Sequence, residues 1–324
     1  MAGAARDLRF DLVTATVDRT EPLEALLASL DNQTHTAFRL VVVDQNADDR
    51  VPALLRAHPR LDVLLLRSQR GLSRARNAAL PHLDADLVAF PDDDCVYEPD
   101  LLARVAERFA TDGRLDGLTG RAVDLDGSSD PSWRADAAVL DPSNLWNRVI
   151  SFTLFLRRDV VASVGPFDER LGLGSGTPWS SGEELDYVLR ALRSGARVVY
   201  DPDLTLTHAR KRYTASELRA VGRRDGASVG WMLRRHGYGA RTTARMLLRP
   251  MGGIGVPHDD SFDEDRPPAA EDIASAIVAI LADRERYAAA ARRRAVERFA
   301  LADWLERHAA IFGELVPQGD GAPR

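Results

Sequence analysis

Cysteine is almost absent from this chain: Cys95 is the only one among 324 residues. A single cysteine excludes an internal disulfide and suits a reducing compartment, so we expect a cytoplasmic protein. Long apolar runs are missing as well. The roughly 18 consecutive apolar residues that a membrane span requires occur nowhere, and the first residues lack the apolar core of a secretory signal. The sequence therefore predicts no transmembrane segment.

An excess of positive charge is also lacking. The net charge is -6, which gives no overall basic field and excludes nucleic acid as the main partner. Lysine is nearly absent, since Lys211 is the only lysine among the 43 basic residues. Hydrophobic residues make up 45% and charged residues 28%, as in globular proteins. The length predicts one large domain and an appendage.

Apolar runs and helical patterns alternate in the first half of the chain. Strands are predicted at 10–16, 39–43, 62–66 and 86–90, with helices from Pro22, near 51–57 and over 71–80 between them. This alternation predicts a parallel, three-layer α/β sheet.

The second half is less regular. Residues 124–147 are rich in Asp, Ser, Pro and Trp and predict a surface excursion, while four glycines within 172–182 predict a mobile loop. Further elements are expected as a strand at 151–156, a short helix within 157–172, a helix at 183–193, strands at 197–200 and 204–208, and helices at 214–236, 240–249 and within 270–316.

A triple aspartate follows the apolar strand at 86–90. In open α/β sheets, ligands bind beyond the carboxyl ends of the strands, where Asp92, Asp93 and Asp94 are expected. Three adjacent carboxylates repel one another unless water or a cation neutralises them, and Mg²⁺ and Mn²⁺ prefer oxygen ligands. Asp44 ends another predicted strand and is expected at the same edge. These positions favour a divalent metal site, although the triplet alone is equally compatible with a solvated acidic turn.

Acidic residues also open the helix that follows the glycine-rich loop. Glu183, Glu184 and Asp186 offer carboxylates, and transfer to a hydroxyl group needs a general base. Ser181 and Glu184 also form a capping-box pattern, and acidic first turns favour the helix dipole. A purely structural role is therefore the alternative.

Three other side chains are candidates. His208 ends a predicted strand and suits a neutral metal ligand, with a structural histidine as the alternative. Arg76 begins the helix before the acidic strand, where an arginine pairs with phosphates or faces water. Trp179 offers an apolar face to a sugar ring or anchors the loop.

Together these segments resemble the family 2 glycosyltransferases of the GT-A fold, from about residue 10 to residue 236. The resemblance is carried by VTATVDRTEPLEALLASLDNQT (13–34), VVVDQN (41–46), GLSRARNAAL (71–80), DLVAFPDDDCVYEPDLL (86–102) and the segment 157–208, and the acidic turn is of the DDD-Cys-x-Tyr type of a bacterial subgroup. It implies a GT-A-like α/β fold with a mostly parallel central sheet flanked by helices. A C-terminal helical appendage weakly resembles the tail of GT-B glycosyltransferases.

The resemblance also implies the domains. They are a catalytic domain at 8–236, with a nucleotide-binding half at 8–123 and an acceptor half at 124–236, then a linker at 237–268, a helical region at 269–316 and a disordered tail at 317–324.

Site roles follow from the same resemblance. It implies nucleotide-sugar contacts from Thr16, Asp44, Arg76, Asp92, Asp93, Trp179 and Glu183, metal ligation by Asp94 and His208, and catalysis by Glu184 or Asp186. Thr16 and Arg19 occupy the family's Thr-x-x-Arg positions. Mn²⁺ or Mg²⁺ is the implied cofactor. Gln45 stands where the family commonly has a second Asp, and Glu184 replaces the Asp of the usual Glu-Asp pair, so both Glu184 and Asp186 stay open as the base.

The implied function is an inverting transfer of a sugar from a nucleotide-diphosphate sugar to a free hydroxyl group. The acceptor is a saccharide, a lipid-linked saccharide or a natural product, and a homo-oligomer through the C-terminal helices is expected. A nucleotidyltransferase that forms a sugar nucleotide is one alternative, although the segment 13–22 lacks the Gly-rich, lysine-containing phosphate loop of that class. A catalytically silent nucleotide-binding scaffold is the other.

Overall fold

The computed structural model describes residues 8–130, 132–210 and 214–239. The chain divides into two compact units, Met1–Tyr238 and Gly239–Arg324. The helices, the tail and the self-association predicted beyond residue 239 lie outside the described residues, as does all but the first part of the predicted linker. None of the described helices is both long and apolar enough to cross a membrane.

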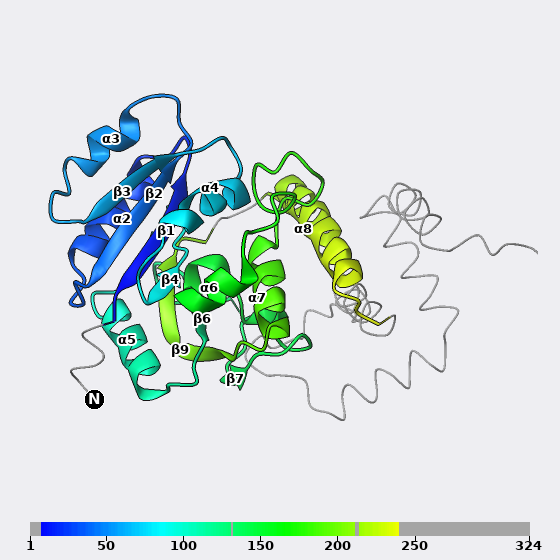
Figure 1. Cartoon of the computed structure of the whole chain (residues 1–324). Coiled ribbons are helices and arrows are strands. Elements are labelled where there is room, and N and C mark those ends of the chain that lie inside the picture. The colour runs from blue at the N-terminus through cyan, green and yellow to red at the C-terminus, as the bar shows by residue number, and fades with distance from the viewer. Residues whose placement is uncertain (1–7, 131, 211–213, 240–324) are drawn as a thin grey trace, which may run out of the picture. The chain divides into compact units, whose positions relative to one another are not determined.

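A nine-stranded sheet forms the middle of the first unit (Figure 1). Its order is β3-β2-β1-β4-β8-β6-β9-β5, with β7 paired to β9. The strands are β1 (Phe10–Thr16), β2 (Phe38–Asp44), β3 (Val63–Arg67), β4 (Leu87–Ala89), β5 (Cys95–Val96), β6 (Gly117–Val123), β7 (Ala138–Val139), β8 (Leu154–Arg157) and β9 (Val198–His208).

The first half of the sheet is parallel. β1 pairs in parallel with β2 and β4, and β2 pairs in parallel with β3. β8 then runs antiparallel to β4 and β6, while β5 and β7 run antiparallel to β9. β8 reverses direction because no crossover helix precedes it: the chain leaves β6 at the carboxyl edge and returns from that edge after residues 124–153. The predicted α/β class is confirmed, and the second half of the sheet is mixed.

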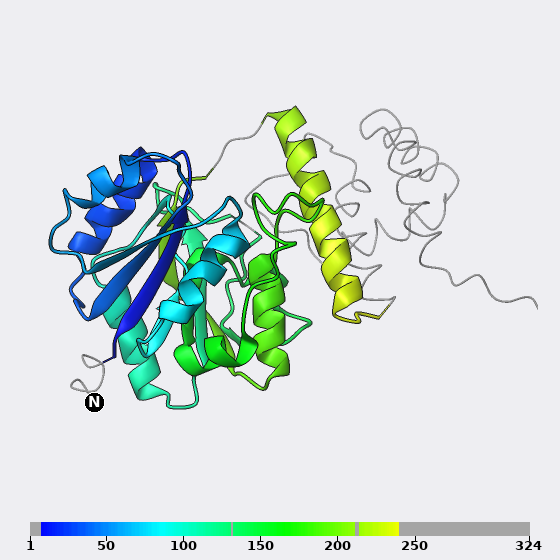
Figure 2. The same cartoon turned by 45° about the horizontal axis from the view of Figure 1, so that its top comes forward.

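Helices cover both faces of the sheet and make three layers (Figure 2). They are α2 (Glu21–Asp31), α3 (Arg50–Leu55), α4 (Leu72–Ala79), α5 (Leu101–Thr111), α6 (Arg158–Val164), α7 (Glu183–Arg193) and α8 (Ala215–Arg235), with short 3₁₀ turns η1 (Leu80–His82), η2 (Leu145–Asn147) and η3 (Ser151–Thr153). Side chains of α2, α3 and α5 pack on one face and those of α4, α6 and α7 on the other. In β1, Leu12 enters the first core and Val13 the second, which explains why this strand is apolar throughout.

Four of the helices and strands are absent from the sequence predictions: α5, β5, β6 and β7. Leu101, Leu102, Val105 and Phe109 lie buried at helical spacing in α5, a pattern that was available in the sequence. The strands predicted at 197–200 and 204–208 form one strand, β9.

Gly120 of β6 makes the long pairing with β9 possible. The register between the two strands shifts between Thr119 and Arg121. A Cβ atom at Gly120 would lie 2.0 Å from the carbonyl oxygen of Leu204, so no other residue fits this close approach of two backbones.

Candidate active site

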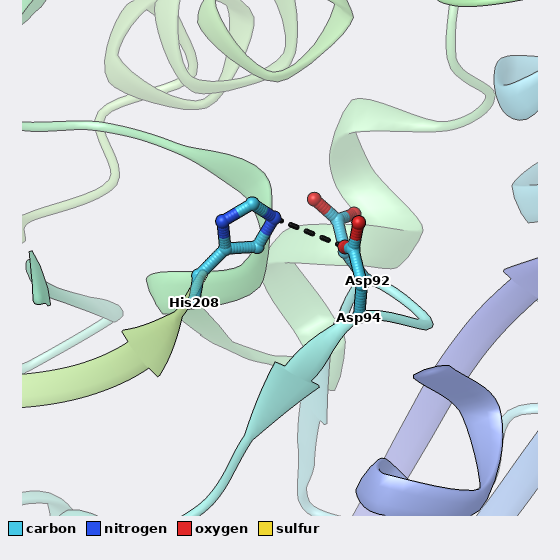
Figure 3. Close-up of side chains that lie close together, drawn as sticks. All are labelled: Asp92, Asp94 and His208. Carbon is cyan, nitrogen blue, oxygen red and sulfur yellow. Dashed lines mark hydrogen bonds and ion pairs between the residues drawn. The ribbon is translucent and has the colours of Figure 1, made fainter. Parts of the chain in front are cut away.

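The acidic turn after β4 meets the end of β9. Cys95 of β5 pairs directly with His208, and this pairing brings the imidazole to the preceding residue, Asp94. His208 Nε2 lies 3.0 Å from Asp94 Oδ1. One ligand atom from each of Asp92, Asp94 and His208 lies within 4.8 Å of the other two, and Figure 3 shows the three side chains gathered at one point. The structure thus brings together the metal ligands expected from the sequence, with Asp92 added to them.

The chemistry of this group fits a divalent cation. Two carboxylates and an imidazole supply oxygen and nitrogen ligands of the kind that Mn²⁺ accepts. The side chains of Asp92, Asp94 and His208 are 28%, 18% and 22% exposed, so a ligand has access to them. Phe152 stacks on the His208 ring, with ring centroids 4.8 Å apart and planes 12° from parallel, and this contact restricts how the imidazole turns.

Asp93 faces β1 rather than His208. It accepts a hydrogen bond from Thr16 Oγ1 at 2.7 Å and one from Arg19 at 2.9 Å. The same Arg19 nitrogen lies 2.6 Å from Asp94 Oδ2, so one guanidinium bridges two neighbouring carboxylates. Burial raises the pKa of Asp93, against the hydrogen bond from Thr16 and the charge of Arg19. Thr16 and Asp93, both predicted from the sequence, therefore contact one another directly.

Arg76 links the acidic turn to α7. Its guanidinium is buried and donates to Glu183 Oε1 at 2.9 Å and to Asp92 Oδ1 at 3.1 Å. It also lies 5.5 Å from the centre of the Phe167 ring. Two carboxylates and an aromatic ring surround this guanidinium, and the contact between Arg76 and the donor stays a prediction.

Glu184 carries the most perturbed carboxyl group near this turn. α7 begins after Gly182, which has a left-handed backbone, and no side chain caps the helix, so the capping-box alternative for Ser181 is wrong. Within the described residues, the Glu184 side chain forms no hydrogen bond or ion pair with another residue, and only its own backbone N–H acts on it as a hydrogen-bond donor. Desolvation, and then the negative charge of Glu183, raise the pKa of Glu184 to about 8. Part of the side chain is still accessible to water, so this carboxyl group can meet a substrate.

Asp92 is perturbed in the same direction. Burial raises the pKa of Asp92 to about 6, and the negative charges of Asp94 and Glu183 act in the same sense, while Arg76 opposes them. Asp92 and Glu184 thus both have a raised pKa and act on each other through their charges, a combination that is common at functional sites.

The known proteins whose sequences resemble this chain include glycosyltransferases. A model of glycosyl transferase family 2 matches residues 11–171, from β1 to the start of the glycine-rich loop. The succinoglycan biosynthesis protein ExoM of Rhizobium meliloti is 26% identical over 258 residues, which cover 76% of this chain and 78% of ExoM. The chain belongs to glycosyltransferase family 2. A second relative, the pre-mycofactocin glycosyltransferase of Mycobacterium tuberculosis, is 25% identical, and the aligned region spans 51% of that protein.

Solved structures agree with this glycosyltransferase fold. Residues 1–349 of TarS from S. aureus superpose with a TM-score of 0.53 and 20% identity, over 74% of this chain and 75% of that one. The mannosyltransferase PcManGT of Pyrobaculum calidifontis, in complex with GDP-Man and Mn²⁺, superposes with a TM-score of 0.55 and 18% identity, over 89% and 86% of the two chains. The likeness at these identities concerns the fold, and the GT-A-like prediction is confirmed.

Asp44 of the glycosyltransferase lies at the end of β2, at the carboxyl edge of the sheet. It is fully buried, and its Oδ1 accepts hydrogen bonds from the backbone and side-chain nitrogens of Asn46. Its Oδ2 accepts no hydrogen bond, although Arg67 lies 3.3 Å away. Asp44 thus has one buried carboxylate oxygen without a hydrogen bond in the described part of the chain, beside the guanidinium of Arg67.

Asp186 and Trp179, two residues predicted for the active site, contact α8 and its end. Asp186 is completely buried and contacts His236 and two arginines. Burial acts to raise the pKa of Asp186, but the hydrogen bond from His236 and the charge of Arg190 outweigh it and lower the pKa. Trp179 packs against Trp231 of α8, with ring centroids 5.5 Å apart. Neither contact with α8 was expected from the sequence.

The structure also adds residues that no short motif identified. Phe152 and Ser151 belong to η3, in a segment read from the sequence only as a strand. Ser151 Oγ lies 3.3 Å from Asp92 Oδ1. The sequence offered no signal for these contacts, because 57 or more residues separate η3 from the acidic turn and the distance closes only in the folded sheet.

Proposed function

We propose that this glycosyltransferase moves a sugar from a nucleoside diphosphate sugar to an acceptor hydroxyl group with inversion at the anomeric carbon. The observation that carries the proposal is the group of Asp92, Asp94 and His208, with Glu184 close enough for Asp92 to raise the pKa of Glu184. Solved structures of the same fold support it, since TarS has been determined with UDP-GlcNAc and PcManGT with GDP-Man and Mn²⁺.

Asp94, His208 and Asp92 are the residues proposed to hold Mn²⁺ or Mg²⁺. A bound divalent cation supplies positive charge that stabilises the diphosphate as it leaves. The charges around this group also favour a cation. Asp92 lies beside Asp94 and raises the pKa of Glu184, and the positive charges of Arg76 and Arg19 offset these negative charges only in part.

Glu184 is proposed as the general base. The acceptor oxygen attacks the anomeric carbon on the face opposite the diphosphate, the bond from that carbon to the diphosphate oxygen breaks, and the acceptor proton passes to Glu184. A carboxylate with a pKa of about 8 holds a proton more tightly than an ordinary glutamate does, which suits proton transfer near neutral pH. The ion pairs of Asp186 support Glu184 over Asp186 for this role.

The donor contacts are proposed for the edge of the sheet around β1 and β2. Asp44 is proposed to contact the nucleotide base, and its Oδ2, which accepts no hydrogen bond in the described part of the chain, supports this role. Asp93 and Thr16 are proposed for the ribose, beside the hydrogen bond that joins them. Glu183 and Trp179 are proposed to border the sugar, and the acceptor is proposed to be a saccharide, a lipid-linked saccharide or a natural product with a free hydroxyl group.

Binding of a donor to the metal site tests the proposal. Thermal denaturation of the full chain is followed with UDP-GlcNAc, GDP-mannose and dTDP-glucose, each with Mn²⁺ and with chelator. A ligand that binds the native state at 100 times its Kd adds about 2.7 kcal/mol of stability. We expect one donor to raise the midpoint only when Mn²⁺ is present, and D94A to lose this rise.

D159A is the matched control. Asp159 lies in the first turn of α6 and is 92% exposed, so its loss removes an acidic group without touching the site. If the donor still raises the denaturation midpoint with chelator present, or in D94A, the metal assignment is overturned. Mn²⁺-dependent binding without any hydrolysis or transfer of the donor would indicate a nucleotide-binding scaffold instead of an enzyme of this mechanism.

A further inference from the structure

The end of α8 is joined to the first turns of α7 by a buried polar pair. His236 Nε2 lies 2.8 Å from Asp186 Oδ1, and both side chains are 1% exposed. Arg235 Nε lies 3.3 Å from the same oxygen. The other carboxylate oxygen accepts from Arg190, one turn further along α7, at 2.9 Å. Asp186 therefore has a partner on each oxygen and no access to an acceptor.

A second contact joins α8 to the residue just before α7. Gly182 has a φ of +82°, and a Cβ atom there would lie 2.6 Å from Met232 Cε. Trp231, next to Met232, packs against Trp179 of the glycine-rich loop and lies under the guanidinium of Arg170. α8 thus packs against the loop that leads into α7, while His236 holds the turn that follows.

The tautomer of His236 follows from its surroundings. Nε2 faces a carboxylate oxygen and donates a hydrogen bond to it. Nδ1 is buried and has no hydrogen-bond partner among the described residues. The contact with Asp186 therefore depends on the N–H group at Nε2.

Glu184 depends on the backbone of α7 for its position. Within the described residues, its carboxyl group has a hydrogen-bond donor only in its own backbone N–H, whereas Arg76 of α4 donates to Glu183. We infer that Asp186 and His236 are positioning residues, which fix the first turns of α7 through α8 and thereby keep the Glu184 carboxyl group beside the acidic turn. This inference rests on the proposed role of Glu184 as the base.

Rate measurements on His236 variants test the inference. Hydrolysis of the donor chosen by the thermal screen is measured with Mn²⁺, because water then replaces the acceptor and Glu184 takes its proton. H236A is expected to lower kcat by about 10- to 100-fold with little change in the donor KM, since a displacement of about 1 Å costs a rate factor of about 100. H236Q is expected to restore most of kcat, because its amide donates from nearly the place of Nε2.

The pH profile of kcat separates positioning from a loss of stability. The charged groups that face Glu184 are Glu183 on α7, Arg76 on α4 and Asp92 after β4. If the first turns of α7 are no longer fixed in H236A, Glu184 becomes more hydrated and lies farther from Glu183. The pKa of Glu184 then falls toward its ordinary value of 4.5. The acid limb of the kcat profile is therefore expected at lower pH in H236A than in the wild-type enzyme and H236Q.

H35A is the matched control. His35 is buried like His236, and its Nε2 contacts the carbonyl oxygen of Leu8, far from α7. H35A is expected to lower the thermal midpoint and leave the pH profile in place. If H236A does not fold, H236N replaces it, since asparagine is too short to reach Asp186.

Two results would count against the inference. The first is a kcat and a pH profile of kcat that are unchanged in H236A. The second is an equal loss of kcat in H236A and H236Q with the pH profile unmoved, because that result would show a structural role only. The proposed function fails separately, when E184Q retains full activity.

Discussion

Replacing Glu184 by glutamine is expected to raise stability and abolish transfer. E184Q keeps the size of the side chain and removes its charge. In the wild-type enzyme, desolvation and the charge of Glu183 raise the pKa of Glu184 from 4.5 to about 8, so the folded state holds a proton that the unfolded chain releases. Glutamine has no proton to release, and the cost of ionising this buried group disappears.

The sign and the pH window follow from proton linkage. Below about pH 4.5 the carboxyl group is protonated in both states, and its ionisation costs nothing. Between 4.5 and 8 the unfolded chain loses the proton first, so the wild-type enzyme loses stability as the pH rises, and above about 8 the loss is complete. At about 1.4 kcal/mol for each tenfold change in proton affinity, the limit is about 5 kcal/mol. Water at the accessible part of the side chain screens the charge, so we expect about 1–3 kcal/mol at pH 8.5.

Urea denaturation at pH 4.5 and pH 8.5 measures this effect, with chelator present to keep cations out of the site. The unfolding free energies of E184Q and wild type should agree at pH 4.5 and differ by the expected amount at pH 8.5. E107Q, which alters an exposed glutamate on α5, should change either value by less than about 0.5 kcal/mol. Equal stability of E184Q and wild type at pH 8.5 would refute the desolvated, negative environment of Glu184.

Three other perturbations follow from the same contacts. R76M should lower the unfolding free energy by about 3–5 kcal/mol in a denaturation experiment, because Glu183 and Asp92 lose their shared buried cation; unchanged stability would show that the two ion pairs do not form. The affinity for Mn²⁺, measured by calorimetry, should fall about tenfold per pH unit below about pH 6, where Asp92 gains a proton; a flat profile would exclude Asp92 as a ligand. G182A should lower the unfolding free energy by at least about 1 kcal/mol, because of its φ of +82° and the approach of Met232 Cε, with M232A recovering part of the loss; if M232A recovers nothing, the contact with α8 is not the cause.

The acidic turn shows how far the sequence carries the site. Asp92, Asp93 and Asp94 follow an apolar strand, and Asp44 follows another, so the edge on which they lie was predictable from the alternation of strands and helices. Each of the strands predicted in that half is present in the structure. His208 was predicted only as a candidate, since nothing local shows that its strand pairs with Cys95.

The roles of Arg76 and Asp186 were beyond a reading of the sequence. Arg76 and Glu183 are 107 residues apart and meet across the face of the sheet. Asp186 meets His236 from 50 residues away, because the end of α8 reaches the first turns of α7. Glu183, Glu184 and Asp186 all open α7, and only neighbours from other elements show that Glu183 and Asp186 form ion pairs.

The sequence alone determined the elements from β1 to β4, the edge of the sheet where the acidic residues lie and the family, because strand and helix periodicity and the residues that end each strand are local properties. The tertiary structure alone decided which carboxylates are paired, which one has a pKa near 8 and which helix holds α7 in place. Those properties depend on burial and on charges brought together from distant parts of the chain, and no local pattern encodes either.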